Sequence, residues 1–144
     1  MNIQSVKRVS DPIFLSDLSP DFSDLEGECP QEEKAYVRVR RATEGDNIQR
    51  HELLLERRTE YRINGDVAIV ESVSDNPRWE AMCNTYLTLE EIHGLLDGDK
   101  PVFEKQPVKT MLAMEYEAIW RELPIVVANV LHRAVLRFNP EWIS

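Results

Sequence analysis

The sequence predicts an α+β fold in which a small antiparallel sheet packs against four to five helices, with a C-terminal helical pair broken at Pro124. Three observations support this class. Apolar residues recur at helical spacing near the C-terminus, residues 35–41 alternate as a strand does, and Asn64-Gly65 is typical of a hairpin turn. We expect an acidic N-terminal arm with a short strand over 1–34 and a single α+β domain over 35–144.

Composition narrows the possible partners. The 144 residues carry a net charge of −9, with 42% apolar and 30% charged residues. The negative charge argues against nonspecific nucleic-acid binding and against an anionic membrane surface, and it favours protein partners that are basic. No apolar run of about 20 residues would span a membrane, and the first residues lack the apolar centre of a signal peptide. Cys29 and Cys83 form no metal or disulfide pattern, so we expect a cytoplasmic location.

The N-terminal segment is distinguished by its charge. A short strand is predicted within 1–9, and residues 11–33 then contain eight acidic residues and no basic one. Ser19 and Pro20 are typical of the cap and first turn of a short helix. Two interpretations remain open: an irregular acidic arm lying on the domain, or an arm that becomes ordered when it binds a partner.

A strand and a helix are predicted next. In 35–41, either Tyr36 or Val37 is expected to face inward together with Val39, and Arg38 and Arg40 outward. The arginines of this strand are expected to be charge partners for the acidic arm. Thr43 and Asp46 resemble a capping box, so a helix should begin there and reach about residue 61. The Asn-Gly turn predicts strands at 60–63 and 67–73, and the helix and the hairpin compete for 58–62.

Pro77 is expected at the first position of a further helix, because proline suits that position. Cys83 lies on the apolar face of this helix and should belong to the core. Residues 87–92 fit either the continuation of the helix or a strand. A tight turn at 97–99 and an extended piece at 101–104 follow.

The C-terminal segment has the densest apolar pattern. Its first helix should end at Leu123, and a second should run over about 124–138, with His132 on its polar face. Trp142 and Ile143 are expected to fold back onto the pair. Such stripes suit either a core or a surface that binds another protein's helix. The candidate partner-binding residues are Leu112, Tyr116, Ile119, Trp120, Leu123, Val127, Leu131, Phe138 and Trp142.

No catalytic residue, metal site or cofactor is predicted. His51-Glu52 lacks the second histidine of a zinc-protease helix, since Leu55 stands at that position. His93 and His132 have no ligands at suitable spacing. Five glycines provide no phosphate-binding loop, and Asp97-Gly98-Asp99 lacks the other ligands of a calcium loop.

Two stretches resemble a known group of proteins: YVRVRRATEGDN at 36–47, and W-x-x-L-P-x-x-V-A-N-x-L-x-x-A-V-x-x-F-N-P-x-W at 120–142. Together they cover about a quarter of the chain and are similar to small morphogenesis proteins of tailed bacteriophages, some of them tail assembly chaperones. The resemblance implies binding to the tape-measure protein, whose apolar helices such chaperones keep soluble. The well-known members are largely helical, whereas strands are expected here.

The apolar stripes and the absence of catalytic motifs predict a non-enzymatic protein that binds other proteins. The resemblance implies, more specifically, a phage morphogenesis protein and most specifically a tail assembly chaperone in the host cytoplasm. The alternative is a structural subunit of the tail or neck, located in the virion. A homo-oligomer is possible under either hypothesis, and neither requires a nucleic acid or a membrane.

Overall fold

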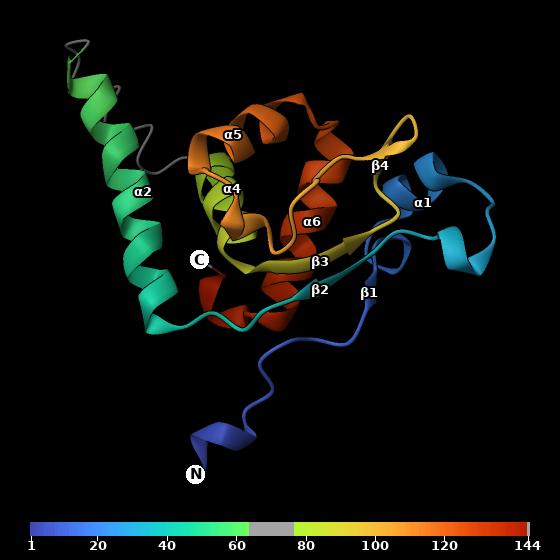
Figure 1. Cartoon of the computed structure of the whole chain (residues 1–144), viewed down its shortest axis with the longest axis horizontal. Helices are drawn as coiled ribbons and strands as arrows, with labels where there is room; N and C mark the ends of the chain where they lie inside the picture. Colours follow the sequence, from blue (N-terminus) through green and yellow to red (C-terminus); the bar gives the residue numbers. More distant parts are fainter. Residues whose placement is uncertain (64–76, 144) are drawn as a thin grey trace.

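The computed structural model describes residues 1–63 and 77–143, with side chains described at all of these positions except 56–63. The α+β class is confirmed: the described residues form five α-helices, a three-stranded antiparallel sheet and a separate two-stranded hairpin (Figure 1). The strands are β1 (Ile13–Phe14), β2 (Tyr36–Val39), β3 (Leu89–His93), β4 (Leu96–Asp97) and β5 (Lys100–Pro101). The helices are α1 (Pro20–Glu26), α2 (Glu44–Ile63), α4 (Pro77–Thr88), α5 (Ala113–Glu122) and α6 (Ile125–Phe138). Short 3-10 turns occur at Ile3–Ser5, Leu15–Asp17, Gln31–Glu33, Val108–Thr110 and Pro140–Trp142.

The central strand of the main sheet is β2, which pairs antiparallel with β1 and β3. Val37 and Val39 are fully buried, whereas Arg38 between them is half-buried. The strand and the inward Val39 were predicted, and of the two alternatives Tyr36 and Val37 it is Val37 that is buried, because successive strand side chains point to opposite faces. The register with β3 shifts between Arg38 and Val39.

The outer edge of β3 is closed by a side chain. The Gln106 carboxamide accepts a hydrogen bond from the Ile92 backbone N–H (3.2 Å) and donates one to the Ile92 carbonyl (2.8 Å). An amide side chain thereby occupies the place that a neighbouring strand would take. Open strand edges invite pairing with other chains, so Gln106 protects this edge.

One hydrophobic core joins the sheet to the helices. Helix α6 packs on β2, α4 packs against α6, and α2 packs against α4 at the periphery (Figure 1). The core includes buried residues from both ends of the chain and from the segment between them. Its fully buried large side chains are Tyr116, Phe103, Leu15, Leu87, Leu89, Leu131, Val37, Val39, Val108, Val130 and Val135.

The acidic N-terminal segment contributes to this core. Leu15 and Phe22 are buried in it, and β1 forms the other edge of the sheet. The strand predicted within 1–9 is wrong: residues Ile3–Ser5 form a 3-10 turn, and Val9 makes only an isolated bridge with Arg40. The first strand lies instead at Ile13–Phe14.

The long helix α2 continues past its predicted end. It reaches Ile63, so residues 60–63 are helical and the first predicted hairpin strand is wrong. The second predicted strand, 67–73, lies outside the described residues. Thr43 and Asp46 form the expected reciprocal cap: the Asp46 carboxylate accepts from the Thr43 N–H (2.8 Å), and the Thr43 hydroxyl accepts from the Asp46 N–H (3.2 Å).

Helix α4 begins at Pro77 as predicted, and Cys83 is buried. The open question at 87–92 is resolved by a direct change from helix to strand at Thr88–Leu89. The Thr88 carbonyl accepts a hydrogen bond from the Arg40 N–H (2.7 Å), so pairing with the chain after β2 replaces the helical bond. The local preference of these residues for helix or strand is nearly balanced, so pairing with a distant strand decides between the two.

The C-terminal helical pair is confirmed. Leu123 and Pro124 are extended between α5 and α6, and Pro124 is the cap rather than the first helical residue. Trp142 folds back and is buried as predicted, but Ile143 is exposed, so its predicted return to the core is wrong.

Candidate functional site

Helix α5 is held on the core by Tyr116. The Tyr116 ring lies 5.1 Å from the ring of Tyr86 and 5.5 Å from that of Phe103, and its hydroxyl lies 2.7 Å from the hydroxyl of Thr85. Burial raises the pKa of Tyr116, against the Thr85 hydrogen bond. Because Tyr116 turns one face of α5 toward the core, the neighbouring face of this helix can line a groove at the surface.

The β4–β5 hairpin stands opposite α5. Gly98 adopts a positive φ of 65° at its turn, a conformation that favours glycine. Leu96 pairs with Pro101, and Asp97 lies opposite Lys100. Phe103 follows directly and is buried, so the hairpin is anchored to the core at its base.

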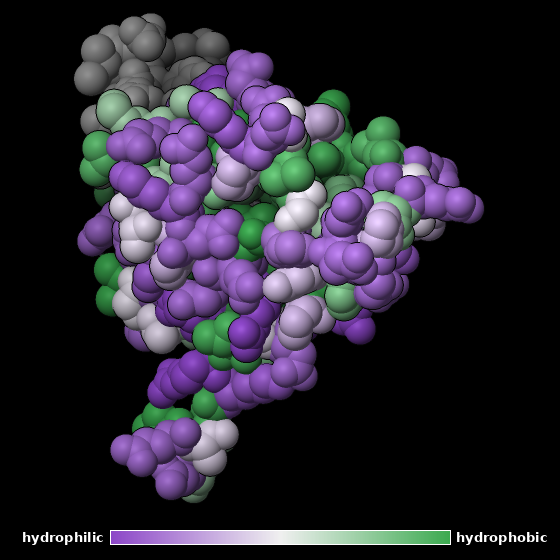
Figure 2. Space-filling model, turned by 45° about the vertical axis from the view of Figure 1, so that its right-hand side comes forward, coloured by the Kyte–Doolittle hydropathy of each residue, from purple (hydrophilic) through white to green (hydrophobic). Residues whose placement is uncertain are grey.

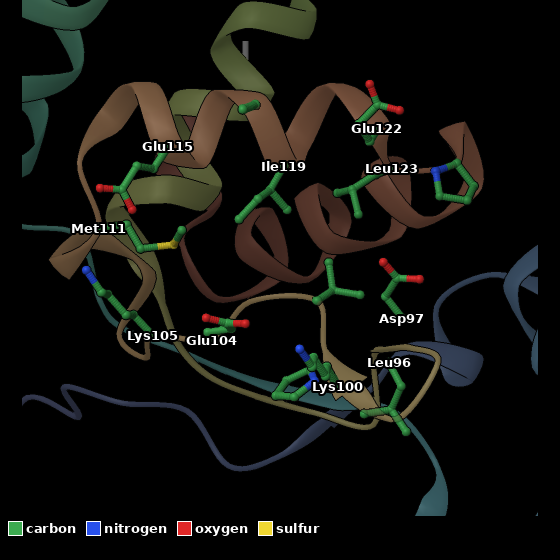
Figure 3. A pocket seen from close by; sticks show the side chains of 14 residues that line it. Leu96, Asp97, Lys100, Glu104, Lys105, Met111, Glu115, Ile119, Glu122 and Leu123 are labelled. Carbon is green, nitrogen blue, oxygen red and sulfur yellow. The ribbon is translucent and has the colours of Figure 1, made fainter.

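A groove with a volume of about 920 Å³ lies between α5 and this hairpin (Figure 3). Ile119 on α5 and Leu123 just after it point into the gap, and Leu96 lies across from them (Figure 3). The lining is Leu96, Asp97, Lys100, Pro101, Val102, Glu104, Lys105, Met111, Glu115, Ala118, Ile119, Glu122, Leu123 and Pro124. We call this the α5–hairpin groove. It has apolar walls and a charged margin.

Large apolar side chains are exposed on the hairpin and near the ends of α5. Leu112 is the residue before α5, Met114 lies in the first turn of α5, Ile125 begins α6, and Leu96 lies on the hairpin, all of them 61–77% exposed. Figure 2 shows apolar surface gathered near the top of this face of the molecule, bordered by hydrophilic side chains. Contiguous apolar surface with a polar margin is typical of interaction sites.

A second, smaller pocket of about 270 Å³ lies among α2, α4 and the start of α5. Its lining is Leu53, Leu54, Trp79, Met82, Cys83, Tyr86, Ala113, Met114, Tyr116 and Glu117. Met114 therefore lies at the margin of this pocket, on the same helix that lines the α5–hairpin groove.

The structure divides the nine predicted partner-binding residues into three groups. Tyr116, Leu131 and Trp142 are buried in the core. Leu112 is exposed and precedes α5 instead of lying on its predicted helical face. The remaining residues are half-buried: Ile119, Trp120, Leu123, Val127 and Phe138.

Of the predicted residues, only Ile119 and Leu123 line the α5–hairpin groove. Sequence reasoning missed the opposite wall, over residues 96–105. The apolar Leu96 and Val102 on either side of the Gly98 turn were the available signal, because two apolar side chains on one short hairpin can form part of an apolar patch.

The two stretches that carried the family resemblance meet in space. The Asn139 amide accepts a hydrogen bond from the Ala42 N–H (2.9 Å) and donates one to the Arg40 carbonyl (3.1 Å). The indole N–H of Trp142 donates to Asn47 (3.1 Å). These bonds attach the end of α6 to the junction of β2 and α2, so the contact is structural.

Arg40 is paired within this junction. Its guanidinium donates to Asp46 (2.8 Å) and to the Leu87 carbonyl (2.6 Å). Burial opposes the ionisation of Asp46, but the hydrogen bonds from Arg40 and Thr43 outweigh it and hold the Asp46 pKa below its usual range. The charge pairing predicted between the arginines and the acidic arm is wrong for Arg40, and also for Arg38, whose ion-pair partner is Glu91 (3.6 Å).

His132 departs from its predicted place on the polar face of α6. It is half-buried, and its Nε2 lies 3.1 Å from the Asn84 amide nitrogen, while Arg50 donates to the Asn84 oxygen (2.6 Å). Burial, and secondarily the Arg50 charge, lowers the pKa of His132 to about 4. The neutral imidazole accepts the Asn84 hydrogen bond.

The three histidines lie apart in different settings. His51 is exposed on α2, and His93 stacks on Tyr36 with ring centroids 4.8 Å apart. Among the side chains that the structure describes, at 1–55 and 77–143, no three His, Cys, Asp or Glu are grouped as a metal site would require. Among the described helices, none has the length and apolarity to cross a membrane.

Comparison with known proteins yields no relative: no family model, no curated protein and no solved structure matches the chain.

Proposed function

We propose that this chain is a non-enzymatic binding protein for another polypeptide and, within that class, a tail assembly chaperone of a tailed bacteriophage. The α5–hairpin groove carries the first part of the proposal, together with the exposed Leu96 on its hairpin wall. Apolar grooves of this kind accept an amphipathic helix from a partner. The second part depends on the resemblance of residues 36–47 and 120–142 to phage morphogenesis proteins.

The partner is the tape-measure protein, bound in the host cytoplasm before the tail tube assembles. A chaperone covers apolar helices that would otherwise associate with one another, because buried apolar surface is stabilised by roughly 25 cal/mol per Å². The net charge of −9 keeps such a complex soluble.

Co-expression tests this function. A tape-measure protein from a phage genome that encodes this chain should stay soluble only when the chain is present. Replacing Leu96 with lysine should return most of it to the insoluble fraction, because Leu96 lines the α5–hairpin groove and its exposed side chain would then carry charge. The matched control is Leu25→Lys, since Leu25 is equally large and exposed but lies on α1.

A second measurement separates the chaperone from a structural tail or neck subunit. Mass spectrometry of purified phage particles should lack peptides of this chain if it is a chaperone. Stoichiometric peptides in the particle, or failure of pulldowns to recover any tail protein, would contradict the proposal.

A further inference from the structure

We propose that the α5–hairpin groove binds a basic amphipathic helix, with lysine or arginine residues seven positions apart on either side of its apolar contact residues. This inference rests on the proposed function and specifies the chemistry of the partner.

The shape of the groove suits a helix of about three turns. Helix α5 has ten residues and is therefore about 15 Å long. Four of its residues line the groove at helical spacing: Glu115, Ala118, Ile119 and Glu122. Residues at i, i+3, i+4 and i+7 form one continuous face. The small exposed side chain of Ala118 in the middle of this face lets a partner backbone approach closely.

The margin of the groove has an excess of carboxylates. Asp97, Glu104, Glu115 and Glu122 contribute four negative charges, and Lys100 and Lys105 contribute two positive ones (Figure 3). Asp97 lies opposite Lys100 across the hairpin, so those two charges offset each other locally. The remaining margin is acidic. On the α5 wall, Glu115 and Glu122 line the groove and no lysine or arginine of this helix lines it with them.

These carboxylates are available to a partner. None of the six charged side chains of the margin forms an ion pair with another described residue. Glu117, on the same helix but outside the groove, does pair, with Arg121 at 3.3 Å. Acidic side chains beside apolar walls attract a cationic segment and fix its register.

The spacing of the acids on α5 defines the spacing expected in the partner. Glu115 and Glu122 are separated by seven residues, or about 10 Å along the helix axis. A second helix running alongside presents side chains at the same repeat. A second copy of this chain is disfavoured as the occupant, because each copy has a net charge of −9 and brings the same acidic margin.

A pair of synthetic helical peptides tests the inference. The first carries lysines seven residues apart around leucine, alanine and isoleucine, and the second is identical except that glutamate replaces each lysine. Fluorescence anisotropy of a labelled peptide, titrated with the full-length chain, should show binding of the lysine peptide. The glutamate peptide should bind at least about tenfold more weakly, and added salt should weaken binding of the lysine peptide.

Variants place the binding in the groove. Ala118→Arg should abolish it, because a long cation then fills the centre of the groove. Glu115→Gln combined with Glu122→Gln should weaken it by about tenfold. Asp24→Asn combined with Glu28→Gln is the matched control: it changes the net charge equally at exposed positions outside the groove and should leave affinity unchanged. Circular dichroism checks that each variant remains folded.

Four outcomes would overturn the inference. The first is equal binding of the two peptides, and the second is an unchanged affinity of the Glu115/Glu122 variant for the lysine peptide. The third is an equal loss of affinity in the Asp24/Glu28 control. The fourth is self-association of the chain that Ala118→Arg abolishes, which would assign the groove to a second copy. The proposed function is tested separately. If the two peptides do not differ in binding but the tape-measure protein still needs the chain to stay soluble, the groove inference fails and the chaperone function stands. If the lysine peptide binds in the groove but no tail protein depends on the chain, the function fails and the inference stands.

Discussion

The Asn84 side chain links two charged or chargeable groups inside the helical layer. Its oxygen accepts from the Arg50 guanidinium, and its amide lies within hydrogen-bonding distance of His132 Nε2. Protonation of His132 would place a second donor opposite the Asn84 amide and a second cation near Arg50. The arrangement therefore requires a neutral imidazole, consistent with the lowered pKa of about 4.

The stability of the protein should consequently decrease in mild acid. In the unfolded chain His132 takes up a proton near pH 6.5, whereas in the folded chain it does so only near pH 4. As pH falls through this window the unfolded state binds the extra proton, and the free energy of unfolding should drop by about 2 kcal/mol, allowing for partial solvent screening. Below pH 4 this residue causes no further loss.

Urea unfolding at pH 7 and pH 4.5 measures this decrease. His132→Gln keeps an acceptor for Asn84 but removes the titration, so it should flatten the pH dependence. His51→Gln is the control, since His51 is exposed. An identical pH dependence in wild type and His132→Gln would show that His132 does not cause the loss.

At the scale of elements, the sheet depends on a side chain outside it. Gln106 pairs with both backbone groups of Ile92 and so replaces a fourth strand along part of β3. Ile92 is itself buried, with 7% of its surface exposed, so water does not readily take over these bonds.

Gln106→Ala should open this edge. Loss of the carboxamide leaves the Ile92 N–H and carbonyl unpaired, which should cost about 1–3 kcal/mol of stability. Hydrogen–deuterium exchange by NMR should show a faster Ile92 amide, and the protein should associate more readily at high concentration. Gln49→Ala, at an exposed position on α2, serves as the control. Unchanged exchange at Ile92 would argue against the protective role of Gln106.

Across the whole molecule, the acidic N-terminal segment and the rest of the chain share one core. Leu15 is fully buried and packs in the cluster that contains residues of β2, α4 and α6. Three residues further on, the Leu18 carbonyl accepts a hydrogen bond from Arg133 on α6, which lies more than a hundred positions away in the sequence.

Leu15→Ala should therefore destabilise the entire protein, by about 2–5 kcal/mol. Tryptophan fluorescence and circular dichroism should report the same shifted transition, because the tryptophans lie outside the N-terminal segment. Leu25→Ala, at an exposed position, should change stability by less than about 0.5 kcal/mol. A fluorescence transition that is unaffected by Leu15→Ala would mean that residues 1–34 unfold independently.

Only part of the groove could be predicted from the sequence. Helical spacing places Ile119 and Leu123 on one apolar face, and both line the groove. The same spacing also selected Tyr116, which is buried. Periodicity defines which residues share a face, but it does not say whether the core or the solvent covers that face.

The sequence by itself determined the local features whose physical causes are local: the α+β class, the break at Pro124, the start of α4 at Pro77, the Thr43–Asp46 cap and the alternation of β2. Proline geometry, capping bonds and side-chain period act within a few residues, so they can be recognised in a short stretch. Tertiary structure alone decided the helix-to-strand change at Thr88, the burial of Leu15 and the placing of the β4–β5 hairpin opposite α5. Each of these depends on contacts between segments that are distant in the sequence. The free energy of those contacts exceeds the small local secondary-structure preferences that a sequence pattern reveals.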